Sequence, residues 1–141
     1  MNINKQLAEL KSFDLPADEF VIVSSGALAI RGIREAKDLD LITTPSLWDQ
    51  LVKHYPVSRN EFGVERIALN EGIEILNSNQ SIFGNGKTIP LQQIFDQADL
   101  FEGLKFINLK HLKVIKQKLG REIDIGDVEL IDAYWSHSAA S

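Results

Sequence analysis

Apolar residues recur along the chain with two different spacings, which predict where helices and strands lie. Residues 3–10 carry apolar side chains at helical spacing and predict a short N-terminal helix that ends before Pro16. Residues 20–23, Phe-Val-Ile-Val, form a β-branched run that is typical of a buried strand. In residues 38–42, acidic and apolar side chains alternate, which predicts a second strand with one polar face.

The middle of the chain predicts another helix and then a hairpin. Thr44 suits an N-cap and Pro45 the first helical position, so a helix should begin there and end before Pro56. Residues 64–69 and 73–76 predict two strands joined by a short turn. The chain therefore alternates between helices and strands throughout its first half.

The second half predicts mainly helix. The expected segments are a polar, glycine-rich loop at 77–87, a short helix at 90–98, a short strand or extended stretch at 103–107, and helices at 109–119 and 121–135. Asn108 suits the N-cap and Gly120 the C-cap of the first of these two helices. Together the elements predict an α+β (mixed α/β) fold, with a small mixed sheet flanked by helices and a C-terminal helix pair. The length, 141 residues, is typical of a single domain over 1–141.

Composition removes several classes of function. Twenty acidic and fifteen basic residues give a formal net charge of −5, which argues against nonspecific nucleic-acid binding through a broad basic surface. Without cysteine, the chain has neither disulfides nor a thiolate zinc site. No apolar run approaches the roughly 20 residues that span a bilayer, and the N-terminus lacks the apolar core of a signal peptide. We therefore expect no membrane contact and a cytoplasmic location.

Asp38 and Asp40 are the most informative pair of residues. On a strand, both carboxylates would point to one face and the leucines beside them to the other. One interpretation is an ordinary polar face that meets water. The other is a site for a hard divalent cation, which proteins hold with one or two carboxylates and substrate phosphates.

The residues upstream favour the second interpretation. The strand at 20–23 runs into Ser24, Ser25, Gly26 and Ala27, and a helix-compatible stretch follows. A strand, a small-residue turn and a helix start expose backbone N–H groups and the positive end of a helix dipole, which suit a phosphate.

This arrangement resembles the nucleotidyltransferase superfamily, the fold of DNA polymerase beta and of small antibiotic-modifying nucleotidyltransferases. In that superfamily a Gly-Gly or Gly-Ser turn contacts the nucleotide phosphates and an Asp-x-Asp pair binds the metals. The resemblance implies that Ser25 and Gly26 contact phosphate and that Asp38 and Asp40 hold Mg²⁺ or Mn²⁺. The chain departs from the pattern at Ser25, which stands where the family has the first glycine and takes positive φ less freely.

The resemblance also implies a third carboxylate on a later strand, and Glu74 is our candidate for this metal ligand. Ile73 and Ile75 flank it, so on a strand Glu74 occupies the face opposite them. The alternative is an ordinary glutamate that faces solvent. Glu65 and Glu71 are weaker candidates, with surface charge as their expected role.

Four basic residues are candidates for phosphate contacts. Arg31 and Arg34 fall between the turn and the Asp pair, and could contact phosphate or the acceptor, or simply balance the carboxylates. Residues 116–127 resemble a Lys-, Arg- and Asp-rich segment of minimal nucleotidyltransferase domains, in which Lys118 and Arg121 would approach the triphosphate. Alternatively, Arg121 pairs with Asp124 or Asp127, and Lys118 with Glu122, on the helix surface.

The activity implied by the resemblance is metal-dependent transfer of a nucleoside monophosphate from a nucleoside triphosphate to an acceptor nucleophile. The alternative is a catalytically weak or inactive nucleotidyltransferase-like protein with a binding or regulatory role, such as an antitoxin-like subunit. The sequence does not identify the acceptor, which could be a small molecule, a protein or RNA. A chain this short has little material for an acceptor domain, so a homodimer interface or a partner protein could supply that substrate.

Overall fold

The computed structural model describes residues 3–79 and 88–140. Its strands are β1 (Phe20–Val23), β2 (Leu39–Thr43), β3 (Ser58–Arg59), β4 (Glu65–Asn70), β5 (Ile73–Leu76), β6 (Asp99–Phe101) and β7 (Leu104–Phe106). Its helices are α1 (Ile3–Ser12), α2 (Ser25–Ala29), α3 (Pro45–Leu51), α4 (Leu91–Asp96), α5 (Leu109–Leu119) and α6 (Glu122–Ala140). The predicted mixture of helices and strands is confirmed.

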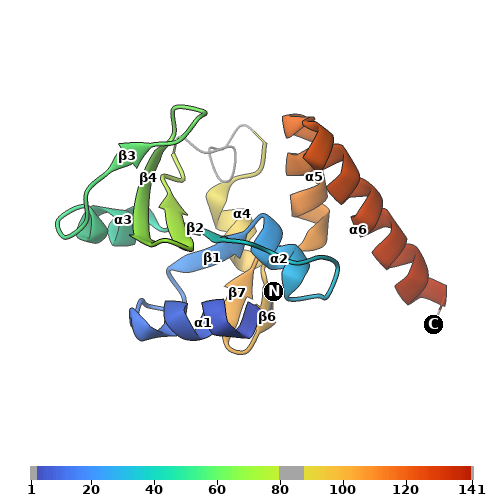
Figure 1. Ribbon diagram of the computed structural model, residues 1–141, viewed down its shortest axis with the longest axis horizontal. Helices are drawn as coiled ribbons and strands as arrows, with labels where there is room; N and C mark the ends of the chain where they lie inside the picture. The colour runs from blue at the N-terminus through green and yellow to red at the C-terminus, as the bar shows by residue number, and fades with distance from the viewer. Residues whose placement is uncertain (1–2, 80–87, 141) are drawn as a thin grey trace.

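The strands form one seven-stranded mixed sheet in the order β3-β4-β5-β2-β1-β7-β6 (Figure 1). Strand β2 pairs with β5 in parallel, and β1 pairs with β7 in parallel. The remaining neighbours are antiparallel. The mixed sheet expected from the sequence is therefore present, and β2 and β1 lie at its centre.

Side-chain alternation along the central strands builds a core on each face of the sheet. Leu39 and Leu41 of β2 are fully buried and pack with residues of α1 and α3. Ile42 points to the other face and packs with residues of α2, α4, α5 and α6. Because side chains alternate along a strand, Asp40 shares the face of Ile42. The candidate metal ligand thus lies on the side of the sheet that the C-terminal helices cover.

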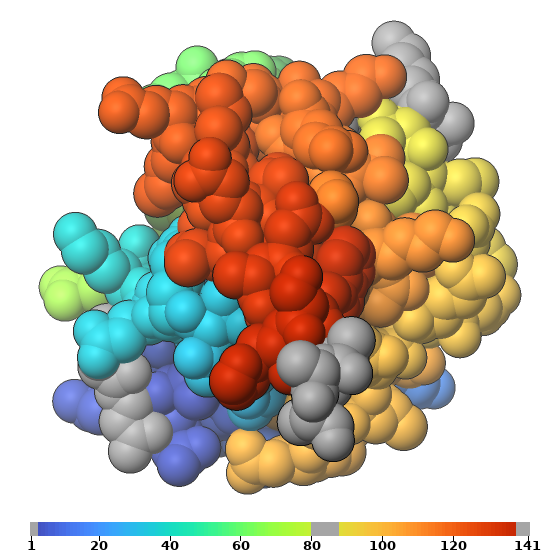
Figure 2. Space-filling model, turned by 90° about the vertical axis from the view of Figure 1, so that its right-hand side faces the viewer, coloured from blue at the N-terminus to red at the C-terminus, as the bar shows by residue number. Residues whose placement is uncertain are grey.

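The C-terminal helix pair forms as the sequence predicted, and its ends carry the expected caps. The side chain of Asn108 accepts a hydrogen bond from the His111 N–H at 2.7 Å, and Gly120 ends α5 with φ of 64°. Helices α5 and α6 pack together at one side of the sheet (Figure 1). Figure 2 looks onto that side, where α6 lies beside the loop between α2 and β2.

The structure differs from the predictions in its shortest elements. Strands β3 and β6 were not expected, since two or three residues are too few to show a periodic pattern. The helix expected at 90–98 spans Leu91–Asp96, and β6 follows it. Most of the loop expected at 77–87 lies outside the described residues. No helix in the described residues is both long enough and apolar enough to cross a membrane.

Candidate functional site

Two of the three predicted carboxylates lie side by side on neighbouring strands. Strands β2 and β5 run parallel with Asp40 in register with Glu74, so both side chains leave the same face of the sheet. Ile73 and Ile75 are buried on the opposite face, as the alternation predicted. Asp38 immediately precedes β2 and is exposed. The sheet therefore brings the three carboxylates to one region.

Burial and repulsion from its neighbours both raise the pKa of Asp40. Burial, and then the negative charges of Glu74 and Asp38, raise the pKa of Asp40 from its ordinary 3.8 to about 6. The positive charges of Lys116 and Arg66 act in the opposite direction and only partly compensate. A carboxylate that its neighbours repel in this way favours a bound cation.

Glu74 already has a partner. The Arg66 Nε donates to Glu74 Oε2 at 2.9 Å, and Arg66 Nη1 also donates to the Ser58 hydroxyl at 3.1 Å. Within residues 3–79 and 88–140, no group of three or more Asp, Glu, His or Cys side chains is arranged to hold a metal ion. Asp38 and Asp40 line the pocket described below, whereas Glu74 is not among the described residues that do, and the pair would need substrate phosphates and water to complete the coordination of Mg²⁺ or Mn²⁺.

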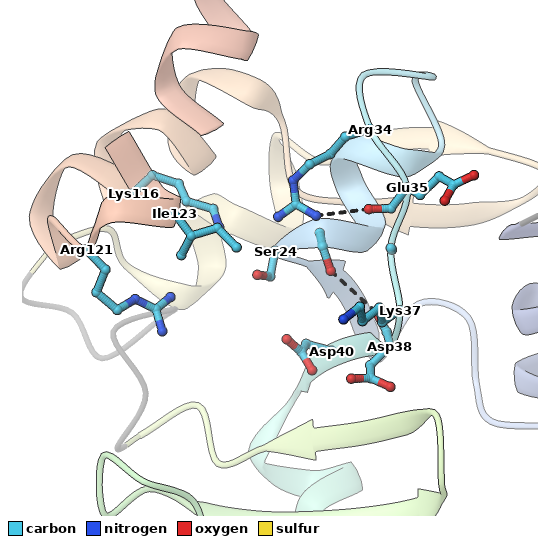
Figure 3. Close-up of a pocket in the computed structure, with 11 residues that line it drawn as sticks. Ser24, Arg34, Glu35, Lys37, Asp38, Asp40, Lys116, Arg121 and Ile123 are labelled. Carbon is cyan, nitrogen blue, oxygen red and sulfur yellow. Dashed lines mark hydrogen bonds between the residues drawn. The ribbon is translucent and has the colours of Figure 1, made fainter. Parts of the chain in front are cut away.

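A pocket of about 410 Å³ opens beside these carboxylates (Figure 3). Its lining residues are Ser24, Ser25, Arg34, Glu35, Ala36, Lys37, Asp38, Asp40, Lys116, Arg121 and Ile123. Asp38 and Asp40 form what we call the acidic wall. Lys116 of α5 and Arg121, in the link between α5 and α6, form with Arg34 what we call the basic wall. The pocket thus has the charge arrangement that a metal-bound polyphosphate requires.

The turn between β1 and α2 differs from the expectation at one residue. Ser24, and not Ser25, adopts a conformation suited to glycine, with φ of 58° and ψ of −136°. A non-glycine residue in this region stores strain, which is typical of ligand-binding turns. Ser25 is the first residue of α2, and its hydroxyl donates to the Asp38 carbonyl at 3.4 Å. Ser24, the residue with the strained backbone, lines the pocket next to Ser25, the residue that the resemblance selected.

Gly26 is buried, and packing accounts for the absence of a side chain there. A Cβ at this position would lie 2.8 Å from Ile22 Cγ2 and 3.0 Å from Leu39 Cδ2. Gly26 does not line the pocket among the described residues. The glycine allows α2 to approach the sheet closely, whereas the resemblance had implied a phosphate contact.

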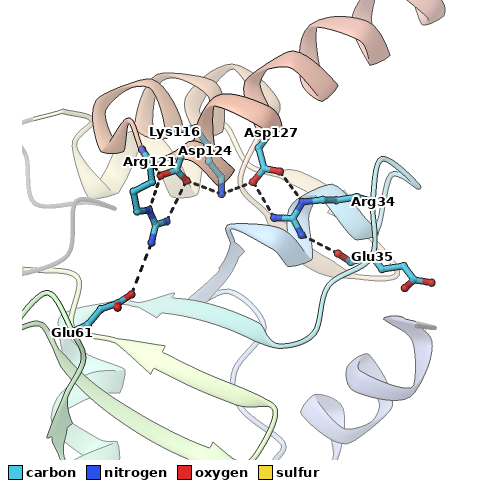
Figure 4. A network of polar contacts seen from close by, with 7 residues as sticks. All are labelled: Arg34, Glu35, Glu61, Lys116, Arg121, Asp124 and Asp127. Atoms are coloured by element: carbon cyan, nitrogen blue, oxygen red, sulfur yellow. Dashed lines mark hydrogen bonds and ion pairs between the residues drawn. The ribbon is translucent and has the colours of Figure 1, made fainter.

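The basic wall is held by a buried network of ion pairs (Figure 4). Lys116 Nζ lies 2.8 Å from Asp127 Oδ2 and 3.3 Å from Asp124 Oδ1. Arg34 donates to both carboxylate oxygens of Asp127, at 2.7 and 2.9 Å. Arg121 likewise donates to both oxygens of Asp124, at 2.6 and 3.2 Å. Each aspartate is thus shared between Lys116 and one arginine.

These pairs keep the network ionised. Burial acts to raise the pKa of Asp127, but hydrogen bonds from Arg34 and Lys116 outweigh it and hold that pKa below the ordinary value. Burial likewise acts to raise the pKa of Asp124, but the hydrogen bond from Arg121 and the charge of Lys116 outweigh it, so this pKa is also lowered. Glu61 Oε1 lies 4.0 Å from Arg121 Nη1 as well, so three carboxylates balance the three cations of the network (Figure 4). The pairs therefore keep Arg34, Lys116 and Arg121 charged where they line the pocket.

Two predicted phosphate contacts lie elsewhere. Arg31 is only 4% exposed and binds Asp99 at 2.6 Å and the Ala27 carbonyl at 2.6 Å, so it holds α2 against β6. Lys118 is exposed on α5 and is not among the described residues that line the pocket. Residues two apart on a helix lie on nearly opposite faces, and Lys116 is the α5 lysine that lines the pocket.

Sequence reasoning missed Lys116, although the chain carries a signal for it. Lys116 lies four residues after Leu112 and next to Ile115, so it falls on the apolar, buried side of α5. A lysine on a buried stripe requires a partner, and Asp124 and Asp127 follow at helical spacing on the next segment. Arg121 was predicted to contact phosphate, with pairing to Asp124 or Asp127 as the alternative; it pairs with Asp124 and also lines the pocket. That aspartate is fully buried rather than on the helix surface.

Comparison with known proteins assigns no family to the chain. No protein-family model matches the sequence, and no curated protein matches it as a relative.

Proposed function

We propose that the protein is a nucleotidyltransferase-like domain that binds a nucleoside triphosphate with Mg²⁺ or Mn²⁺ and transfers the nucleoside monophosphate to an acceptor. The observation that carries the proposal is the register of Asp40 with Glu74 on parallel strands, next to Asp38. The resemblance implies three neighbouring carboxylates, and this register supports it, with Glu74 paired to Arg66 and outside the described residues that line the pocket.

The charges of the pocket support a metal-bound triphosphate as the ligand. The acidic wall, Asp38 and Asp40, suits a divalent cation. The basic wall suits phosphate oxygens, and its arginines are held in place by Asp124 and Asp127. Because the cations are already oriented, binding would cost little side-chain entropy. A ligand that carried only negative charge would be repelled by the acidic wall.

The transfer would proceed by attack of an acceptor oxygen on the α-phosphorus, with loss of pyrophosphate. The divalent ion would polarise the phosphoryl group and neutralise its charge. Asp38 and Asp40 would hold that ion, and Arg34 and Lys116 of the basic wall would orient the phosphates and stabilise the leaving pyrophosphate. Glu74, which Arg66 orients, would accept the proton of the acceptor hydroxyl.

Thermal melts with each nucleoside triphosphate, with and without Mg²⁺ or Mn²⁺, test the binding step. A ligand at 100 times its dissociation constant adds about 2.7 kcal/mol, which should raise the melting temperature by several degrees. We expect this rise in the wild type and none in Asp38→Asn/Asp40→Asn. The control is Asp18→Asn/Asp49→Asn, which makes the same charge change at exposed positions outside the pocket. The absence of any metal-dependent rise in the wild type would contradict the proposal.

The second candidate is a binding or regulatory protein that retains the pocket without the chemistry. The ion pair between Arg66 and Glu74 favours it, since the third carboxylate is already neutralised. A transfer assay with a triphosphate labelled at the α-phosphate separates the two candidates. Label transferred to a candidate small molecule, protein or RNA supports the enzyme, whereas metal-dependent binding without transfer to any of them supports the regulatory role.

A further inference from the structure

Two large apolar side chains are exposed beside an otherwise charged pocket. Phe62, in the turn between β3 and β4, is 57% exposed, and Ile123, at the start of α6, is 58% exposed. Ile123 lines the pocket, and Phe62 lies at its rim, outside the described residues that line it but against one that does. Arg121 connects the two, since it lines the same pocket and its guanidinium carbon lies 5.2 Å from the centre of the Phe62 ring. The basic wall thus ends in an aromatic and aliphatic surface.

The turn that carries Phe62 is held rigidly by its own hydrogen bonds. The Asn60 side chain accepts from the Phe62 N–H at 2.9 Å and from the Val64 N–H at 3.0 Å. The Asn60 N–H donates to the Val64 carbonyl at 2.9 Å, and Arg59 donates to the Gly63 carbonyl at 2.7 Å. An exposed aromatic ring on a preorganised turn binds a flat ligand at low entropic cost.

Arg121 is also fixed. Its two hydrogen bonds to Asp124 orient the planar guanidinium, and Phe62 lies against it. Aromatic rings and arginine planes are the surfaces on which proteins stack nucleobases. The pair therefore offers a ready stacking surface next to the cations of the basic wall.

We propose that Phe62 and Arg121, with Ile123 beside them, form the nucleobase subsite of the pocket. This inference rests on the proposed function, because it identifies where the base of the bound triphosphate lies. A nucleoside triphosphate carries a flat, uncharged base at one end and its charge at the other. The pocket has the same order, with the acidic wall on one side and Arg121 and Ile123 on the other (Figure 3). Stacking on a single ring accepts every base and favours the larger purines.

Calorimetric titration of Mg²⁺-tripolyphosphate and of Mg²⁺-ATP separates the base from the phosphates. The wild type should bind ATP more tightly than tripolyphosphate. Phe62→Ala should weaken ATP binding about tenfold, the scale of one lost base stack, and leave tripolyphosphate binding unchanged. Phe62→Trp should retain ATP binding. Leu100→Ala removes a side chain that is 67% exposed on β6, outside the pocket lining, and should change neither affinity.

Three results would overturn the inference. Equal wild-type affinity for ATP and tripolyphosphate would rule out the base subsite and leave the proposed function standing. An equal effect of Phe62→Ala on the two ligands would have the same meaning. If the wild type binds neither ligand, the proposed function and the base subsite fail together.

Discussion

A carboxylate beside two others destabilises a folded protein unless something neutralises it, and Asp40 is in this position. Its pKa is raised to about 6, above the ordinary 3.8 of the unfolded chain. The folded state therefore binds the proton more tightly than the unfolded state. The contribution of Asp40 to the free energy of unfolding is therefore fully present below a pH of about 4, and it is lost as the pH rises through about 6.

Asp40→Asn should therefore stabilise the metal-free protein at pH 7.5. Removing the charge recovers up to about 3 kcal/mol of unfolding free energy, which corresponds to a pKa of about 6 in the folded protein against 3.8 in the unfolded chain. The gain should shrink towards pH 4.5, where Asp40 is mostly protonated in the folded protein. Urea unfolding with a chelator present at both pH values measures it, with Asp49→Asn at an exposed position as the control. A loss of stability at pH 7.5 would show that burial and repulsion do not act on Asp40 as described.

The sequence predicted which faces of the strands carry the carboxylates, but not the strained turn or the long-range ion pairs. Alternation along two strands placed Asp40 and Glu74 on polar faces, because the period of a strand is fixed by geometry. The strain at Ser24 left no trace in the sequence, since a serine has no preference for positive φ. The pairing of Arg31 with Asp99, 68 residues away, depends on the packing of β6, a strand too short to predict.

At the scale of elements, the close approach of α2 to the sheet sets the position of the pocket turn. Ser24 and Ser25 line the pocket and continue directly into α2. Gly26 lies against Ile22 and Leu39, so a side chain at this position would push the helix outward. The turn and the sheet can keep their relative positions only while residue 26 remains a glycine.

Gly26→Ala should destabilise the protein by about 1–3 kcal/mol, the usual cost of overpacking a core. The matched variant is Gly126→Ala in α6, where a Cβ would meet no atom within 4 Å. That substitution should stabilise the protein by about 0.5–1 kcal/mol, because alanine is the better helix former. Thermal melts of the two variants should shift in opposite directions. A stabilising Gly26→Ala would mean that α2 is not packed as the structure describes.

Helices were easier to predict from the sequence than the short strands. In α5, however, the sequence did not identify which lysine faces the pocket. Its caps, Asn108 and Gly120, follow from residue chemistry that acts within a few positions. Which α5 lysine faces the pocket depends instead on where α6 packs. The resemblance selected Lys118, whereas the apolar stripe around Leu112 and Ile115 accounts for Lys116.

At the scale of the whole molecule, one buried network joins parts of the chain that are far apart in sequence. Arg34 comes from the loop before β2, Lys116 from α5, and Asp127 from α6. Both aspartates have lowered pKa values, so their contribution to stability is present above the ordinary carboxyl pKa. It is lost as the pH falls through their lower, folded-state values. The network therefore attaches the helix pair to the sheet at neutral pH.

Lys116→Met should destabilise the protein by about 3 kcal/mol, because it leaves buried carboxylates short of a cation. Lys118→Met makes the same chemical change at an exposed position and should shift stability by no more than about 0.5 kcal/mol. Urea unfolding at pH 7 compares them. Equal effects of the two substitutions would contradict the buried position of Lys116.

The two walls of the pocket belong to different parts of the molecule, and this has a consequence for any ligand that bridges them. Asp38 and Asp40 lie at the start of β2, whereas Lys116 lies in α5 and Arg121 in the link between α5 and α6. A ligand that contacts both walls stabilises the packing of the helix pair against the sheet. By thermodynamic reciprocity, that packing strengthens the binding of the ligand by the same free energy. A bound ligand should then slow amide hydrogen exchange along α5 and α6, including turns of these helices that do not line the pocket.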